Sequence, residues 1–256
     1  MATILRHLGA WGRPPDVSAQ GWRGDELFGW ITIVVTLVLA LVLVQLALVV
    51  VRSRRPGAPS ATGGDSRTAQ LVALSGALLL FLLVDGVAFL RGWDDLSAGL
   101  LRRPAASERI VDVEVLAQQW AWTFRLAGDD GTFGTDDDVV VTHALHLPAG
   151  RPAQLELRSK DVMHSLYVPQ LRIKRDAQPG ATTELLLEPT REGQYEIACT
   201  QHCGLNHYKM RATLDVMDSA AFDRWAHQES MLAKQRASAR TSDGMWAWPF
   251  GKEARR

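Results

Sequence analysis

The residues best able to do chemistry gather within twelve positions in the C-terminal third of the chain. The segment CTQHCGLNHYKM, residues 199–210, places Cys199, Cys203, His207 and Met210 at spacings of four, four and three. Thiolate and thioether sulfur are soft donors that suit copper, and imidazole suits copper as well, whereas a hard cation prefers carboxylates. The donor set therefore predicts a copper site.

The presence of two thiolates favours two metal ions over one. A mononuclear blue-copper site uses two histidines, one cysteine and a weak axial methionine, so one thiolate would be left over. If both sulfurs bridge a pair of copper ions, each ion still needs a terminal nitrogen, which requires a second histidine. His164, in the upstream segment SKDVMHSLYVP, is the obvious candidate, because it lies between two predicted strands.

Two other interpretations of the cysteines remain open at this point. In an oxidising compartment a pair of cysteines forms a disulfide by default. A structural zinc site also fits the number of Cys and His ligands, but it leaves Met210 without a purpose. His202, which lies between the cysteines, is expected to stay unligated because Cys203 crowds it.

Short segments of alternating hydrophobicity predict the elements that hold these residues. Between residues 105 and 217 such segments end at turn-forming residues, as in RIVDVEVLAQQWAWTFRL, RPAQLELRS and GQYEIACT. Period-two alternation with regular turn signals is typical of a small β-sandwich or barrel. Residues 218–256 begin with a predicted helix around AAFDRWAHQESMLAKQ and then lose their pattern.

The N-terminal part of the chain reads as a membrane anchor. Residues 28–51 carry no charge, and residues 71–91 are apolar apart from Asp85 and Arg91. Each run is long enough to cross a bilayer, which takes roughly 20 apolar residues. We therefore predict a transmembrane helical hairpin over residues 28–91, retained as an anchor rather than cleaved as a signal peptide. Residues 1–27 contain Pro14 and Pro15 and are predicted to form an external tail without regular structure.

Charge indicates the orientation of this anchor. The linker between the two spans holds four arginines against one acid, and short Lys/Arg-rich loops stay cytoplasmic. Both termini and the β-domain are then expected on the outer, periplasmic side of a bacterial-type inner (plasma) membrane. The 28 basic and 28 acidic residues balance, so nothing predicts a nucleic-acid partner.

Three segments in order, SKDVMHSLYVP, LRIKRDAQPG and CTQHCGLNHYKM, closely resemble the CuA domain of cytochrome c oxidase subunit II. The two predicted spans match the anchor of that family. The resemblance implies a cupredoxin-like sandwich or barrel, with Cys199 and Cys203 bridging a dinuclear copper centre between His164 and His207. It also implies that Met210 is an axial thioether and that Gln201 offers its backbone carbonyl.

Gln201 departs from the family pattern, in which a glutamate at this position also reaches a magnesium ion. A neutral amide binds a hard dication less well than a carboxylate does. The sequence therefore predicts a weak or absent magnesium site at the contact with the catalytic subunit.

Two further features bear on the electron donor. The alternation in AQQWAWTF predicts that Trp120, Trp122 and Phe124 lie on one face of a strand. Trp120 resembles the exposed tryptophan through which this family accepts electrons from cytochrome c, whereas Trp122 and Phe124 are as readily core residues. The acidic loop, GDDGTFGTDDD, is either a solvated hairpin, a docking surface for a basic cytochrome, or, with a poorer match in spacing, a calcium loop. Its carboxylates are Asp129, Asp130, Asp136, Asp137 and Asp138.

The resemblance implies an electron-transfer subunit of a proton-pumping cytochrome c oxidase. Its expected partners are haem–copper subunit I and other oxidase subunits, membrane lipid, and a soluble or membrane-bound c-type cytochrome as donor. The chain has no CxxCH motif and therefore no fused c-type haem of its own. Rival interpretations are the CuA subunit of a nitric oxide reductase, a nitrous oxide reductase and a Sco-type copper chaperone, which lacks the HxxM that follows the cysteines here.

Overall fold

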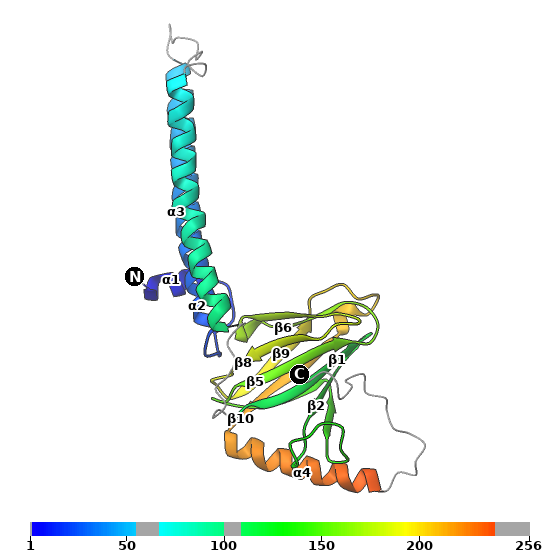
Figure 1. Ribbon diagram of the computed structural model, residues 1–256. Coiled ribbons are helices and arrows are strands. Elements are labelled where there is room, and N and C mark those ends of the chain that lie inside the picture. Colours follow the sequence, from blue (N-terminus) through cyan, green and yellow to red (C-terminus); the bar gives the residue numbers. More distant parts are fainter. Residues whose placement is uncertain (1, 55–66, 100–108, 239–256) are drawn as a thin grey trace. The chain divides into compact units, whose positions relative to one another are not determined.

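The computed structural model describes residues 2–54, 67–99 and 109–238 of the 256 (Figure 1). The chain divides into two compact units. One unit holds the N-terminal helices, and the other holds the β-strands, the C-terminal helix and a short segment, residues 13–21, that precedes the first long helix.

Three helices form the first unit: α1 (Ala2–Ala10), α2 (Gly21–Ser53) and α3 (Arg67–Gly99). The two long helices are apolar enough to cross a membrane, because an 18-residue stretch within Gly21–Ser53 has a mean hydropathy of 3.1 and one within Gln70–Asp94 has a mean hydropathy of 2.3. Most of their leucine and valine side chains are exposed, as expected for helices that face lipid. Arg91 of α3 lies 3.8 Å from Glu26 of α2, so the start of one helix meets the end of the other, as in the predicted hairpin.

The prediction that residues 1–27 lack regular structure is wrong for residues 2–10, because these residues are helical. Leu5 of α1 is buried, and the Arg6 guanidinium lies 4.1 Å from the Trp22 ring centroid and 3.6 Å from a Glu26 carboxylate oxygen. α2 also begins seven residues before the predicted span. The first turn of α2 is polar, so hydropathy, which detects only the lipid-facing part of a helix, does not indicate it. At this end the Gly21 N–H donates to Ser18 Oγ at 2.7 Å.

The second unit is a sandwich of two five-stranded sheets, with strand orders β3-β2-β1-β5-β8 and β4-β10-β9-β6-β7. The β1–β5 and β10–β4 pairs are parallel and the other pairs are antiparallel. The strands are β1 (Val111–Gln118), β2 (Ala121–Leu126), β3 (Val139–Thr142), β4 (Ala144–Pro148), β5 (Ala153–Ser159), β6 (His164–Val168), β7 (Ile173–Ala177), β8 (Thr183–Leu187), β9 (Gly193–Cys199) and β10 (Arg211–Met217), with 3₁₀ turns η2 (Pro169–Leu171) and η3 (His207–Lys209). This confirms the predicted all-β domain.

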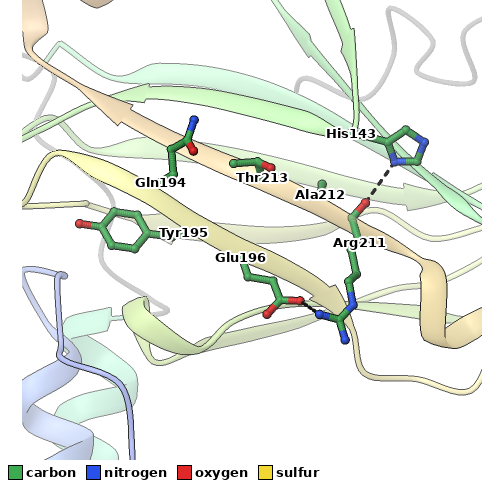
Figure 2. Close-up of a pocket in the computed structure, with 7 residues that line it drawn as sticks. All are labelled: His143, Gln194, Tyr195, Glu196, Arg211, Ala212 and Thr213. Atoms are coloured by element: carbon green, nitrogen blue, oxygen red, sulfur yellow. Dashed lines mark hydrogen bonds and ion pairs between the residues drawn. The ribbon is translucent and has the colours of Figure 1, made fainter.

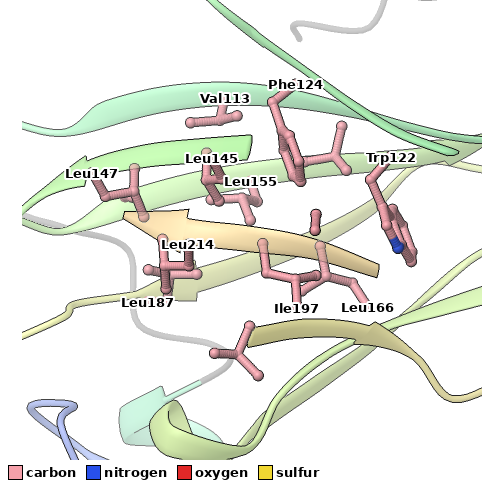
Figure 3. Packing of buried hydrophobic residues seen from close by; sticks show 14 of the residues in the cluster. Val113, Trp122, Phe124, Leu145, Leu147, Leu155, Leu166, Leu187, Ile197 and Leu214 are labelled. Carbon is pink, nitrogen blue, oxygen red and sulfur yellow. The ribbon is translucent and has the colours of Figure 1, made fainter. Parts of the chain in front are cut away.

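The core lies between the sheets, where alternate residues of each strand point inward (Figure 3). In β5 the burial alternates strictly, with Ala153, Leu155 and Leu157 inside. Trp122 and Phe124 of β2 are completely buried. Aromatic side chains contribute most of the buried area in a small core, and these two anchor one sheet against the other.

Two further segments complete the sandwich. The C-terminal helix α4 (Ser219–Ser238) contacts β3 and β4, with Phe222 buried and the Trp225 ring 4.3 Å from the His146 ring. The helix confirms the prediction for the start of residues 218–256. Val17 is buried and pairs through its backbone with Gln170 and Thr190, so residues 13–21 form part of the sandwich rather than a loose tail.

Candidate metal centre

Two neighbouring strands bring the upstream histidine to the cysteines. β6 begins at His164, β9 ends at Cys199, and the two strands pair antiparallel with Leu166 opposite Cys199. The start of β6 therefore lies beside the end of β9. The backbone N–H of Thr200 donates to the Ser165 carbonyl at 3.0 Å, which holds the chain leaving β9 next to the histidine.

The eleven residues between β9 and β10 fold back to deliver the other donors. The Cys199 N–H donates to the Met210 carbonyl at 3.1 Å, which closes the loop at its base. Within the loop, His207 N–H donates to the Gly204 carbonyl at 3.1 Å, and Met210 N–H donates to the His207 carbonyl at 3.1 Å. These bonds form η3 and place His207 and Met210 back over the cysteines.

The predicted donors converge on one small volume. Cys199 Sγ and Cys203 Sγ are 3.8 Å apart, and Cys203 Sγ lies 3.4 Å from His207 Nδ1 and 3.8 Å from Met210 Sδ. Cys199 Sγ lies 4.0 Å from His164 Nδ1. It is also 3.2 Å from the backbone carbonyl oxygen at position 201. The four other predicted ligand positions thus each place a donor atom within 4.0 Å of one of the two sulfurs.

This donor set fits a copper centre held by two thiolates. Both cysteines are free thiols, and their separation far exceeds the roughly 2.05 Å of a disulfide bond. His164 and Met210 are fully buried, and Cys199 and Cys203 nearly so, which gives soft donors in a dry frame. Cys199, Cys203 and His164 form a group whose ligand atoms lie close enough together to hold a metal ion.

The two thiols differ in acidity. Burial raises the pKa of Cys199, but hydrogen bonds from His164 and from neighbouring backbone groups outweigh it and bring that pKa to about 6. Burial and the adjacent Cys199 charge raise the pKa of Cys203 to about 12. Without metal the pair therefore carries one negative charge near neutral pH, and a metal ion held by both thiolates would release the second proton.

Asp161 orients the buried imidazole. Its Oδ1 lies 2.8 Å from His164 Nε2, and its Oδ2 accepts the Gln119 backbone N–H at 2.7 Å. Burial raises the pKa of Asp161, but these hydrogen bonds lower it by more, so the group remains a carboxylate. A carboxylate on one imidazole nitrogen fixes the tautomer and directs the other nitrogen at the metal. The acid three residues before His164 was the available signal for this role, and the sequence reasoning missed it.

Gln119 and Gly204 connect the predicted electron acceptor to the ligand loop. The Gln119 side-chain amide donates to the Cys203 carbonyl at 2.7 Å. A Cβ on Gly204 would lie 2.9 Å from Gln119 Nε2 and 3.4 Å from Trp120 Cζ2, so the indole lies directly against the backbone that follows Cys203. The sequence reasoning missed both residues.

Trp120 differs in position from the sequence prediction, which placed it on a strand face with Trp122 and Phe124. β1 ends at Gln118 and β2 begins at Ala121, so Gln119 and Trp120 form the tight turn between them. Trp120 is half-buried there. Trp122 and Phe124 are core residues, and the Trp122 ring meets the His164 ring edge-on at 6.2 Å.

The acidic loop joins β2 to β3 and supports α4. Asp137 is buried, where it accepts a hydrogen bond from Ser230 at 3.2 Å and pairs with Lys234 at 3.3 Å. Asp138 is nearly buried against Arg125. Asp129, Asp130 and Asp136 are exposed, and Asp129 pairs with His227. Asp137 and Asp138 thus lie where a docking partner cannot reach them.

A shallow groove of about 440 Å³ crosses the outer face of the second sheet (Figure 2). His143, Gln194, Tyr195, Glu196, Arg211, Ala212 and Thr213 line it, with Glu196 and Arg211 paired and His143 Nδ1 bonded to the Arg211 carbonyl at 3.1 Å. None of the predicted copper ligands lines it. The chemistry of the chain therefore concentrates at the buried sulfur cluster rather than in this groove.

Comparison with known proteins agrees with this geometry. Residues 111–217 match the family model described as cytochrome c oxidase subunit II, periplasmic domain, and this stretch contains both sheets and every predicted ligand. This part of the chain is therefore similar to the periplasmic domain of cytochrome c oxidase subunit II. The matched stretch begins at the first residue of β1 and ends at the last residue of β10, so it corresponds to the β-sandwich.

Curated proteins from several bacteria are similar to this part of the chain. An alternative cytochrome c oxidase subunit 2 of Bradyrhizobium diazoefficiens is 38% identical over 144 residues, covering 48% of this chain and 52% of the relative. A cytochrome c oxidase subunit 2 of Thermostichus vulcanus is 36% identical over 121 residues, covering 47% of this chain and 34% of the relative. The chain thus matches about half the length of the first relative and a third of the second.

Among solved structures, the periplasmic domain of subunit II of the cytochrome oxidase of Bradyrhizobium japonicum is similar to part of this chain. The sequence identity is 18% and the TM-score is 0.43, with 52% of this chain and 97% of that chain covered.

Proposed function

We propose that this chain is the electron-transfer subunit of a membrane-bound cytochrome c oxidase. The carrying observation is the pair of buried free thiols 3.8 Å apart, with two imidazoles and a thioether close to their sulfurs. Cys199, Cys203, His164, His207, Met210 and the Gln201 carbonyl would hold two copper ions. When bound, such a pair supplies one-electron transfer with little rearrangement, because the electron is shared in a rigid frame.

The role of the protein is to hold these donors still and to keep water away. His164, Cys203 and Met210 are each at most 3% exposed, and the backbone bonds at the base of the loop fix the sulfur positions. Trp120 receives the electron from a c-type cytochrome and passes it through its contact with Gly204 to the cysteine loop. A haem–copper catalytic subunit then accepts it, and that subunit reduces oxygen to water and pumps protons.

The membrane unit supports an outer location for the copper domain. Trp22 and Trp30 at the start of α2, and the stacked Phe89 and Trp93 near the end of α3, lie at one end of the hairpin, where an aromatic belt meets the membrane surface. Arg52 and Arg54 lie at the other end. By the positive-inside rule the arginine end is cytoplasmic, which puts both termini and the copper domain outside.

Metal analysis of the purified chain tests this function. We expect two copper ions per chain and a mixed-valence signal with near-infrared absorption, lost in His164→Ala and in Cys199→Ser. One zinc ion per chain, or a Cys199–Cys203 disulfide in the active protein, would contradict the proposal. Identification of the catalytic chain that copurifies with this one, and assay of that complex with oxygen and nitric oxide, tests the final acceptor.

A further inference from the structure

Three loop tips meet around Trp120. The turn at residues 119–120 is bonded to Asp161 through the Gln119 N–H and to Cys203 through the Gln119 amide, and the indole lies against Gly204. Residues 160–163 and 202–209 therefore share one end of the sandwich with the turn. We name this the ligand-loop face; its exposed or half-buried side chains include Trp120, Val162, Met163, Leu205, Tyr208 and Lys209.

The ligand-loop face is unusually apolar for an exposed surface. Leu205 is 91% exposed, Tyr208 66%, Met163 41% and Val162 38%. All four lie in the two loops that carry the predicted copper ligands, each within two residues of Asp161, His164 or His207. Single exposed apolar residues need no explanation, but a cluster around a functional site marks a surface on which a partner docks.

The charge at this face is not acidic. Lys160 and Lys209 are exposed at its rim, and the Lys209 ammonium lies 5.4 Å from the Tyr208 ring centroid. The carboxylate of this face, Asp161, is engaged by His164 and by the Gln119 N–H. A partner whose contact surface carries a ring of lysines would therefore find no free carboxylate among these three loop tips.

The acidic loop lies at the other end of β2. Trp120 immediately precedes this strand and the loop immediately follows it, and six residues of strand span roughly 20 Å. Asp129, Asp137 and Asp138 are also engaged by α4 and Arg125. A protein that touches Trp120 to deliver an electron is thus centred well away from this loop.

We propose that the electron donor docks on the ligand-loop face mainly through apolar contacts, and that the donor has a neutral or acidic surface around its haem edge. This inference rests on the proposed function and specifies its partner. Leu205 and Met163 supply apolar contacts on the same face as Trp120, and the exposed ammonium of Lys209 favours acidic groups on the donor. Each ferrous haem of the donor is oxidised to ferric as one electron passes to the chain.

Rapid-mixing kinetics on the intact oxidase complex tests the proposal with one donor in two charge states. The probes are a lysine-ringed ferrous c-type cytochrome and the same protein succinylated on its lysines. We expect the succinylated form to react at least as fast at low salt, and the rate with the unmodified form to change less than about threefold between low and high ionic strength, because no opposite charges attract it.

Matched variants locate the contact. Leu205→Ser and Met163→Ser are each expected to slow electron uptake about fivefold, the usual effect of removing an apolar anchor. Lys160→Glu with Lys209→Glu should reverse the preference between the two probes. The triple variant Asp129→Asn, Asp130→Asn, Asp136→Asn, at the far end of β2, is expected to keep the parent rate.

Three results would each overturn the inference. The first is a rate that falls steeply with salt in the parent and loses that salt dependence in the triple aspartate variant. The second is unchanged kinetics in Leu205→Ser and Met163→Ser, and the third is loss of the catalytic subunit from these two variants on purification. The last outcome would make the face a subunit contact instead. Copper content and the near-infrared band are measured in every variant. If the parent complex lacks copper or the near-infrared band, the proposed function is refuted. If both are present but the docking variants react at the parent rate, only this inference is refuted.

Discussion

Asp161 Oδ1 and His164 Nε2 lie 2.8 Å apart, with the imidazole fully buried and its other nitrogen facing Cys199 Sγ. The carboxylate therefore decides which nitrogen carries the proton and which is presented to the thiols. Asp161 also accepts the Gln119 N–H, so the same side chain couples the β1–β2 turn to the upstream ligand.

Removal of this carboxylate should weaken metal binding without unfolding the domain. We expect Asp161→Ala to lower copper affinity by roughly 10- to 100-fold, the usual cost of losing such a hydrogen-bond partner. Asp161→Asn, whose amide oxygen can still accept from Nε2, should recover part of the loss. Competition against a copper chelator measures this, with exposed Glu192→Gln as the control. Equal affinities in all four proteins would exclude the role.

Replacement of Trp120 by phenylalanine should slow electron uptake and leave the copper centre intact. A smaller ring loses contact with Gly204, where the indole now lies within 3.5 Å of a Cβ position. We expect at least roughly a tenfold fall in the uptake rate, equivalent to ~1.4 kcal/mol in activation free energy. The near-infrared spectrum should not change. Rapid mixing with a ferrous cytochrome gives the rate, and an unaltered rate would remove Trp120 from the path.

Gln201 should make the subunit interface a poor magnesium site. Its carbonyl lies beside Cys199, and its side chain is a neutral amide rather than the carboxylate that a hard dication prefers. In the oxidase complex we expect Mn²⁺, used as a paramagnetic substitute, to bind weakly or not at all. The Gln201→Glu variant should bind it more tightly. Electron paramagnetic resonance reports both, and a tightly held ion ligated by Gln201 would contradict the prediction.

Protonation of Asp137 should lower the stability of the β-sandwich in acid. Burial raises the pKa of Asp137, but hydrogen bonds from Thr135 and the Asp130 N–H, together with Lys234, bring it from 3.8 down to about 2. A depressed carboxylate pKa stabilises the folded state above pH 4 and loses that contribution as the pH falls towards 2. The shift corresponds to about 2 kcal/mol of unfolding free energy.

The matched pair Asp137→Asn and Asp136→Asn measures this contribution in the full chain by urea unfolding, followed through tryptophan fluorescence. At pH 7 the buried variant should be about 2 kcal/mol less stable than the parent, and the difference should shrink as the pH approaches 2. The exposed neighbour should behave like the parent. A constant difference across this range would mean that packing, not charge, explains the loss.

The sequence predicts the strands and the donor atoms well because both depend on local pattern. Alternating burial in β5 and the dense run from Cys199 to Met210 are legible from residue types and spacing alone. The role of Asp161 and Gln119 is not, because each acts through a contact between loops that are far apart along the chain. The position of Trp120 was missed for a related reason, since a two-residue turn interrupts an otherwise continuous alternation.

The acidic loop illustrates the same limit at the domain scale. Five aspartates in one short stretch suggest a solvated surface, but α4 returns from the end of the chain to cover part of it. Likewise residues 13–21 carry little periodic signal, yet Val17 is buried in the sandwich. Long-range contacts of this kind depend on where distant segments meet, which composition and periodicity do not encode.

The contact between Gly204 and Trp120 limits how this chain can evolve. Gly204 has φ +116°, a conformation that disfavours any side chain, and the indole fills the space that a Cβ would need. A larger residue at 204 is therefore tolerated only together with a smaller ring at 120 and a relaxed backbone, so these two positions should vary as a pair among homologues. Substitution at position 204 or 120 alone would separate the tryptophan from the cysteine loop.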